Sequence, residues 1–179
     1  MAKIQILNAS QADLEQMAAL DHHTSSSYAY KLEFTRDSLS WNYVIQRIRL
    51  PRTVTITYPR ADEALFSSWS QASVVYVGWI ADQITAYATF ESKTLPRTAR
   101  VTNLVVASDV RRKGIGTNML TAGEIWAANN HLERVLIEIP MRNDPAINLA
   151  CKAGYEMCGY MDQYFPNSDP ALFFGKRIG

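Results

Sequence analysis

The most regular pattern in the chain is a pair of β-branched and aromatic runs over residues 74–80 and 84–90. Only residues 81–83 separate them, and so short a connection joins antiparallel strands but cannot hold a parallel crossover. A third run, residues 97–106, follows a polar loop. The pattern therefore predicts an antiparallel meander of three strands.

The period of the apolar positions changes after residue 106, where a short polar turn with glycines opens a helix. Residues 134–139 are then typical of a buried strand after a helix that should end near residues 129–130. A strand, a helix and a strand at this spacing predict a parallel pair with a right-handed crossover, and hence a mixed sheet. The helix should bury one face, formed by Ile115, Met119, Ala122 and Trp126.

The N-terminal part carries weaker signals. Ser10 with Asp13 is the signature of a helix start, and we expect this helix to run to about His22. Residues 24–27 should break it, and residues 28–34 are expected to form a loop or short helix near a surface groove. The other expected elements are a strand at 3–7, a strand at 42–58 with a bulge or edge at Pro51, a short helix or ordered loop at 60–70, a helix from Asp144 to a cap at Gly154, and an antiparallel pair at 155–164 and 171–178.

The composition fits a single domain over residues 1–179. Hydrophobic residues make up 47% of the chain and charged residues 20%, which argues against disorder. The net charge of +1 gives no general attraction to nucleic acid or to a membrane surface. No apolar run has the length of a membrane span or of a signal-peptide core, so a cytoplasmic protein is expected.

The cysteines and histidines indicate neither a disulfide framework nor a metal site. Cys151 and Cys158 are too few for a framework, and we expect free thiols, with Cys151 buried. The pair His22 and His23 has no acidic or cysteine cluster beside it in sequence, which favours a solvated helix end over a metal site. No metal cofactor is expected.

The strongest chemical signal is the segment from Arg111 to Gly116. Its glycines let the backbone approach a ligand, and the helix start leaves free N–H groups with a partial positive charge. Arg111, Arg112 and Lys113 add charge that suits a ligand with more than one phosphate. A P-loop needs its lysine after the second glycine, and a dinucleotide fingerprint needs three glycines, so both of these motifs fit badly.

The pattern Arg111-x-x-Gly114-x-Gly116 resembles the pyrophosphate loop of the GNAT acetyltransferases, and residues 143–155 resemble the second signature of that superfamily. The resemblance implies the GNAT fold, an α/β (α+β) architecture: a mixed, mostly antiparallel sheet with a splayed parallel pair in the middle, flanked by helices. It places the pantetheine arm of acetyl-CoA between residues 104–106 and 136–139. The cofactor-binding residues that it implies are Leu104, Val105, Val106, Arg111, Arg112, Lys113, Gly114, Ile115, Gly116, Thr117 and Asn143.

Within the superfamily the chain is most similar to the streptothricin acetyltransferases, in residues 143–149 and 159–164. Those enzymes acetylate an amine of a cationic antibiotic. Glu138 falls where they carry a glutamate and Asp162 lies in the second stretch, although an ordinary solvated or paired carboxylate stays the alternative for both. For the side chain of Tyr30, core packing and substrate contact are both possible roles. The candidate substrate-binding residues are Tyr30, Asp162 and Tyr164.

Two positions depart from the superfamily pattern. Ala150 replaces the tyrosine that protonates the departing thiolate, and Thr102 replaces a frequent carboxylate base. We therefore expect direct attack of a neutral amine on the thioester, with Glu138 or Glu91 as the proton acceptor and the backbone N–H of Val106 polarising the carbonyl.

These features predict an acetyl-CoA-dependent N-acetyltransferase whose substrate is a small-molecule amine, such as an antibiotic or a polyamine-like compound. The two departures favour an alternative class, a CoA-binding sensor or degenerate protein without catalysis. No nucleic acid or membrane partner is expected, because three clustered cations are a weak footprint on a near-neutral chain. Homodimers are common in the superfamily, so the resemblance also implies a homodimer.

Overall fold

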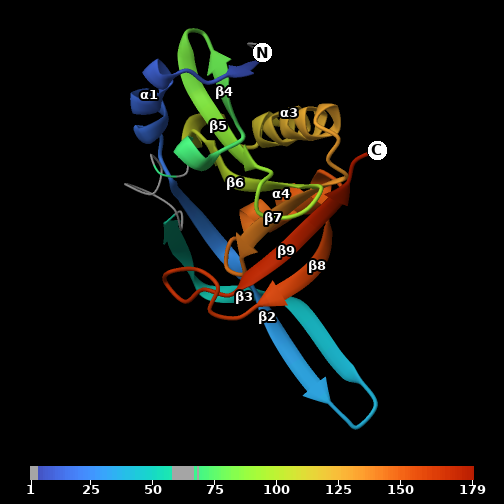
Figure 1. The fold of residues 1–179 in the computed structure, drawn as a ribbon. Coiled ribbons are helices and arrows are strands. Elements are labelled where there is room, and N and C mark those ends of the chain that lie inside the picture. Colours follow the sequence, from blue (N-terminus) through green and yellow to red (C-terminus); the bar gives the residue numbers. More distant parts are fainter. Residues whose placement is uncertain (1–3, 58–66, 68) are drawn as a thin grey trace.

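The computed structural model describes residues 4–57, 67 and 69–179. Its main feature is a seven-stranded sheet in which β6 and β7 are parallel and all other neighbours are antiparallel (Figure 1). The expected mixed sheet is therefore confirmed. In spatial order its strands are β1 (Gln5–Asn8), β4 (Val74–Ile80), β5 (Gln83–Glu91), β6 (Thr98–Val106), β7 (Arg134–Pro140), β9 (Ala171–Arg177) and β8 (Glu156–Met161).

The parallel pair separates along its length. Backbone pairing joins only Thr98–Val101 of β6 to residues 134–137 of β7, and the strands diverge beyond these positions. The splay expected from the resemblance is present, but Leu136 and Ile137 still pair with β6 and lie before the gap. The gap therefore lies between residues 102–106 of β6 and 138–140 of β7.

Helices α3 (Ile115–Asn129) and α4 (Asp144–Lys152) start and end near the predicted residues. Gly154, which follows α4, has a φ of 83°, as expected for a glycine that ends a helix. The buried face of α3 differs from the prediction, because Ala122 and Trp126 are half-buried. The helix is rotated so that Gly123 meets the ring of Phe90, where a Cβ would overlap the ring. The buried residues of α3 are Ile115, Met119, Leu120, Gly123 and Ala127.

The N-terminal helix is shorter than predicted. The Ser10 and Asp13 capping box is present, and it opens the short helix η1 (Gln11–Asp13), which continues into α1 (Leu14–Ala18). The helix does not reach His22. The carboxylate of Asp21 accepts a hydrogen bond from the backbone N–H of His23 (2.9 Å), which turns the chain into a strand instead.

Strands β2 (His23–Arg36) and β3 (Trp41–Thr57) form a separate antiparallel hairpin. The prediction of a loop or short helix over residues 28–34 is therefore wrong, and so is the reading of residues 24–27 as a simple helix break. The strand at 42–58 is confirmed as far as Thr57, and the expected bulge at Pro51 faces a register shift between Ser26 and Tyr28. Tyr58 and most of the predicted short helix at 60–70 lie outside the described residues.

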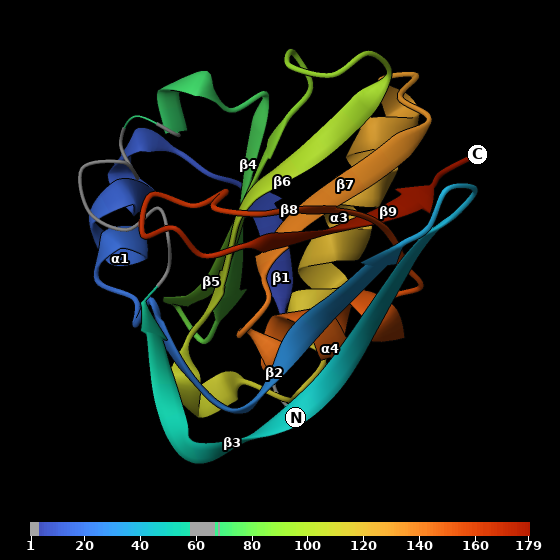
Figure 2. The same cartoon turned by 90° about the horizontal axis from the view of Figure 1, so that it is seen from below.

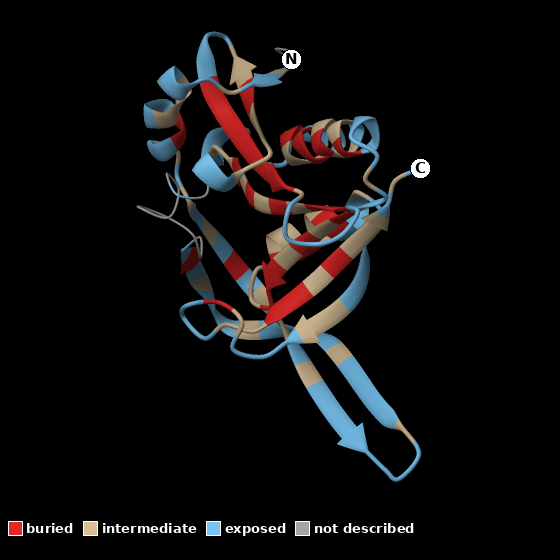
Figure 3. Cartoon of the chain, viewed as in Figure 1, coloured by how far each residue is buried: buried red, intermediate tan, exposed pale blue. Residues whose placement is uncertain are grey.

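The buried residues form two clusters, and Figure 3 shows that buried positions concentrate on the central strands and on α3. Successive side chains of β5 point to opposite faces of the sheet, so Ala86, Ala88 and Phe90 join the cluster that includes α3, whereas Tyr87 joins the cluster that includes Met17 of α1. The hairpin crosses beneath α4 (Figure 2), where the N–H of Tyr30 donates to the carbonyl of Met141 at 2.9 Å. In the part of the chain that is described, no helix is long and apolar enough to cross a membrane.

Candidate active site

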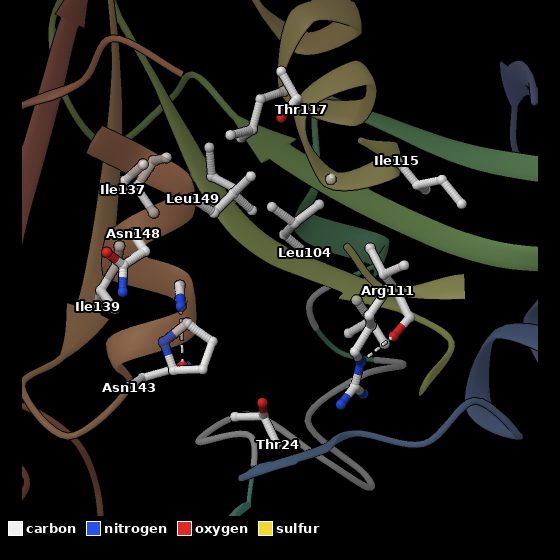
Figure 4. Close-up of a pocket in the computed structure, with 18 of the residues that line it drawn as sticks. Thr24, Leu104, Arg111, Ile115, Thr117, Ile137, Ile139, Asn143, Asn148 and Leu149 are labelled. Atoms are coloured by element: carbon white, nitrogen blue, oxygen red, sulfur yellow. Dashed lines mark hydrogen bonds between the residues drawn. The ribbon is translucent and has the colours of Figure 1, made fainter. Parts of the chain in front are cut away.

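A cavity of about 380 Å³ lies in the gap between β6 and β7 (Figure 4). One wall is formed by β6, the following loop and the start of α3. The opposite wall is formed by β7 and α4, and the segment from Asp21 to Thr24 lies across the mouth. The splay of the parallel pair therefore opens a channel whose two long walls are strand edges.

The edge of β6 presents backbone groups to this cavity. Ala107 donates its N–H to the carbonyl of Thr85 (2.7 Å), which makes the neighbouring position, Val106 opposite Ala86, a pair without mutual hydrogen bonds. The N–H and C=O of Val106 consequently point away from β5 and toward the gap. By the same alternation the backbone of Leu104 also faces the gap, so a ligand laid along β6 can bond as an additional strand would.

The loop between β6 and α3, residues 107–114, carries the residues that were predicted to bind an anion. Gly114 is the residue before α3 and has a φ of 83°, a left-handed conformation that favours glycine. The first turn of α3, from Ile115 to Thr117, lines the cavity with its N–H groups unused by the helix. Gly116 lets α3 approach α4, because a Cβ there would lie 2.9 Å from Leu149.

The three cations of the loop have different positions. Arg111 donates from Nε to the carbonyl of Val106 (2.8 Å) and from its terminal nitrogen to the carbonyl of Asp21 (3.0 Å), which ties the loop to the opposite side of the mouth. Arg112 lines the cavity. Lys113 is exposed and donates to the carbonyl of Asp109 (3.1 Å), outside the cavity wall. Two of the three predicted cations therefore belong to the site wall.

The start of α4 forms the facing wall. Asn143 is its N-terminal cap and accepts a hydrogen bond from the N–H of Ala146 (3.2 Å), which fixes the side chain at the cavity. Ala150 is buried and also lines the cavity, whereas the next residue, Cys151, is exposed. The expectation of a buried Cys151 is thus wrong, because adjacent helix positions point about 100° apart.

The two candidate bases differ in position. Glu138 lines the cavity and accepts a hydrogen bond from Nε of Arg100 (2.8 Å), with its side chain almost fully buried. Glu91 lies outside the cavity wall and closes its own turn, accepting from the hydroxyl of Thr94 (2.6 Å) and from the backbone of Lys93. Burial alone would raise the pKa of Glu91, but the hydrogen bonds from Thr94 and Lys93 hold that pKa below its ordinary value.

The three candidate substrate contacts do not belong to the cavity wall in this structure. Tyr30 lies on β2, where burial and then the negative charge of Asp144 raise the pKa of its phenol. Asp162 is exposed just after β8. Tyr164 packs edge-on against Phe165 and Phe173, with ring centroids 5.1 and 5.3 Å away.

Sequence reasoning missed several wall residues. His22, Thr24 and Phe165 all line the cavity, and the Nε2 atom of His22 is 2.9 Å from the hydroxyl of Tyr87. The pair His22 and His23 was noticed in the sequence, but the prediction of a helix up to His22 led to its interpretation as a solvated helix end. Among the described residues no cluster of His, Cys, Asp and Glu side chains is arranged to hold a metal ion.

A strand edge, a helix start with unused N–H groups and a narrow gap between them form a channel that can accept an elongated ligand along the sheet. The sequence identifies the family: the chain belongs to the Acetyltransferase (GNAT) family, which matches residues 41–155. It is also 32% identical, over 90 residues, to an N-alpha-acetyltransferase of Sulfurisphaera tokodaii, a match that covers 48% of this chain and 52% of that protein. The chain thus matches about half the length of this curated relative.

The fold agrees over nearly the whole chain with two solved structures. Nourseothricin acetyltransferase matches with a TM-score of 0.84 and 17% identity, covering 98% of this chain and 99% of the other. A putative streptothricin acetyltransferase from Bacillus anthracis, solved in complex with acetyl coenzyme A, matches with a TM-score of 0.75 and 14% identity over 99% of both chains. At these identities the likeness concerns the fold.

Proposed function

We propose that the chain is an acetyl-CoA-dependent N-acetyltransferase for an amine of a small molecule. The observation that carries this proposal is the shared cavity. The backbone edge of Val106, the N-terminal turn of α3 and the carboxylate of Glu138 all line it. A site for a phosphate-bearing ligand and a proton acceptor therefore lie within one continuous space.

The residues present fit acetyl-CoA. The N–H groups at the start of α3, together with Arg112, suit the pyrophosphate, because a left-handed Gly114 leaves the approach without a side chain. The gap-facing groups of Leu104 suit an amide of the pantetheine arm, while the carbonyl of Val106 already accepts from Arg111 and its N–H stays available to the thioester. Asn143 faces them across the gap. When bound, acetyl-CoA supplies an acetyl group activated as a thioester.

Glu138 is the residue that we assign as proton acceptor. An amine must lose a proton when it attacks a carbonyl carbon, and a carboxylate in the cavity can take that proton directly or through one water. Arg100, which donates to Glu138 and lies 3.8 Å from Glu91, keeps the carboxylate oriented. Glu91 acts only through this arginine. The N–H of Val106 is aimed into the gap, where it can stabilise negative charge on an oxygen.

A positioned acid at residue 150 is dispensable. Ala150 offers only a methyl group to the cavity. A thiol has an ordinary pKa of about 8.5, so its anion is an adequate leaving group at neutral pH. Positioning of the amine then supplies most of the acceleration.

We further propose a cationic small molecule as the acceptor, with streptothricin-like antibiotics as the first compounds to test. Two observations support this choice: two structures similar over their full length are a nourseothricin and a putative streptothricin acetyltransferase, and Glu138 and Glu91 place two carboxylates around one arginine. This cluster has two carboxylates and one guanidinium, and its one surplus negative charge favours a cation at that end of the cavity. The expected location of the enzyme is the cytoplasm.

The test is release of free thiol from acetyl-CoA during incubation with a panel of amines that includes streptothricin- and aminoglycoside-like compounds. We expect turnover with at least one cationic amine, and a loss of about 10²- to 10⁴-fold in kcat for Glu138→Gln. Glu91→Gln is the matched control and should retain most of the activity. Equal losses in both variants would contradict the assignment of Glu138.

A CoA-binding sensor is the second candidate, and Ala150 and Thr102 favour it. Thr102 has no carboxylate, and its hydroxyl lies 2.6 Å from the hydroxyl of Thr89. Acetyl-CoA at a hundredfold excess over its Kd should stabilise the fold by about 2.7 kcal/mol. A rise in melting temperature without turnover on any amine would favour the sensor, and no rise would reject both candidates.

A further inference from the structure

The cavity between β6 and β7 narrows toward the point where the two strands begin to pair. Val101 and Ile137 are the last paired residues before the strands diverge, and both line the cavity. Leu120 of α3 and Ala150 of α4 also line it, and all four residues are buried. The narrow end of the cavity is therefore an apolar pocket, bounded by two strands and two helices.

The two faces of β7 supply different parts of the site. Successive side chains of a strand point to opposite faces of a sheet. Ile137 and Ile139 belong to the core cluster that includes α3 and α4, so Glu138, which lies between them, points to the other face. An amine that gives its proton to Glu138 therefore approaches the acyl carbon from that face. The face of Ile137 and Ile139 remains for the acyl chain.

The small side chain of Ala150 leaves room in this pocket on the side of α4. A tyrosine at this position, as in the superfamily pattern, would extend into the cavity, whereas alanine contributes one methyl group. Ala146, one turn earlier on the same helix face, is equally small and also lines the cavity. Figure 4 shows Ile137, Leu104 and Leu149 around the same space. Room beside apolar walls favours an alkyl group, because a polar group there would lose its hydrogen bonds to water.

We propose that this pocket holds the alkyl chain of acyl groups longer than acetyl, so that propionyl-CoA and butyryl-CoA are substrates in addition to acetyl-CoA. The inference rests on the proposed function, since it concerns the acyl group of the same co-substrate. In the reaction the amine nitrogen bonds to the acyl carbon and the C–S bond breaks. Glu138 takes the amine proton and the CoA thiolate takes a proton from water, which gives a propionyl or butyryl amide and free CoA.

The first test measures binding in the absence of an amine. Calorimetric titration compares acetyl-CoA, propionyl-CoA and butyryl-CoA, which differ only in CH₂ groups. Each CH₂ group that moves from water into the pocket should lower the Kd about fourfold, so butyryl-CoA should bind roughly tenfold more tightly than acetyl-CoA. A Kd for butyryl-CoA equal to or higher than that for acetyl-CoA would overturn the proposal.

Ala150→Leu fills the pocket and should remove this preference, so that the ratio of the acetyl-CoA Kd to the butyryl-CoA Kd falls by about tenfold. The control is Cys151→Leu, because Cys151 is the exposed neighbour on the same helix and lies outside the cavity wall. An unchanged ratio in Ala150→Leu, or an equal fall in Cys151→Leu, would contradict the assignment of the pocket. Thermal melting checks folding, and Ala150→Val is used in its place if the larger side chain prevents folding.

The second test follows acyl transfer to an amine that the screen with acetyl-CoA identifies. A site that excludes one additional CH₂ group discriminates against it by about 10- to 200-fold. Butyryl-CoA should instead react with a kcat/KM within about tenfold of that of acetyl-CoA, and mass spectrometry should detect the butyryl amide. Acetyl transfer without propionyl or butyryl transfer would overturn the proposal. No transfer from any of the three thioesters would reject the proposed function, while the binding comparison still decides whether the pocket holds longer acyl chains.

Discussion

The loop before α3 and the β2–β3 hairpin both border the cavity, but they are held in different ways. The loop takes most of its shape from nearby residues: Gly114 adopts a left-handed conformation and Arg111 bonds to Val106, five positions earlier, in addition to the carbonyl of Asp21. The hairpin is anchored by Arg47, which donates to Asp144, 97 positions away, at 2.6 and 3.0 Å. The comparison teaches that the side of the cavity proposed for the cofactor is encoded mainly by nearby residues, whereas the opposite side depends on distant contacts.

The largest effect is expected at the loop. Gly114→Val should raise the Kd for CoA by roughly 100-fold, because a branched residue resists a left-handed backbone and fills the approach to several N–H donors. Calorimetric titration measures this change, with Gly159→Ala on β8 as the control, since a Cβ there meets only ordinary contacts. A change smaller than that of Arg112→Ala would show that backbone donors do not hold the ligand.

The next largest effect is a loss of fold stability from a substitution in α3. Gly123→Ala should lower the free energy of unfolding by about 1–3 kcal/mol, since the new Cβ overlaps the buried ring of Phe90. The gain of up to about 1 kcal/mol from better helix propensity is smaller than this cost. Gly116→Ala is the matched control, because Leu149 can move aside. Chemical denaturation should show the loss only for Gly123→Ala.

A smaller, pH-dependent change in Tm is expected when the ion pair of Arg47 and Asp144, which anchors the hairpin, is removed. The hydrogen bond from Arg47 lowers the pKa of Asp144 below its ordinary value, so this pair stabilises the fold above the unfolded-state pKa of about 3.9 and loses that effect as pH falls through the lower, folded-state pKa. Arg47→Met should therefore lower the Tm at pH 7, and the gap from the wild type should shrink below about pH 4.

Arg49→Met is the control for this experiment, because Arg49 lies two positions along the same strand and is also exposed. It should leave the pH dependence of the Tm unchanged. A gap between wild type and Arg47→Met that is equal at pH 3 and pH 7 would mean that the ion pair does not anchor the hairpin.

The smallest effect is expected for single cations of the loop. Arg112→Ala should raise the Kd for CoA by less than about tenfold, and the difference should diminish at high salt, as for one exposed charged contact. Lys113→Ala should change the Kd less still, because Lys113 lies outside the cavity wall. A stronger effect at Lys113 would reveal a phosphate outside the cavity.

Most of the central sheet could be predicted from sequence because its signals are local. The short turn at residues 81–82, Gly114 before α3 and Gly154 after α4 each determine a neighbouring element. The strand β2 was missed although apolar residues alternate from Tyr28 to Phe34, since the preceding serines and the charged residues between them resemble a loop. The hydrogen bonds from its pairing partner, β3, stabilise these residues as a strand.

The candidate site divides in the same way. The loop and Asn143 could be predicted because short motifs carry them, and both line the cavity. The positions of the two candidate carboxylates could not be predicted from the sequence. Only the folded sheet brings Arg100 to Glu138, whereas Glu91 bonds within its own turn. The contact of His22 with Tyr87 joins residues 65 positions apart and has no signature in the sequence.

The closed base of the hairpin has a consequence for how such a protein diversifies. His23 pairs with Thr57, so the two ends of this segment lie side by side, and none of its strands belongs to the seven-stranded sheet. The segment is therefore a self-contained insertion between α1 and the rest of the chain. A different hairpin can replace it by evolution or by grafting while the strand order and the glycine loop stay intact.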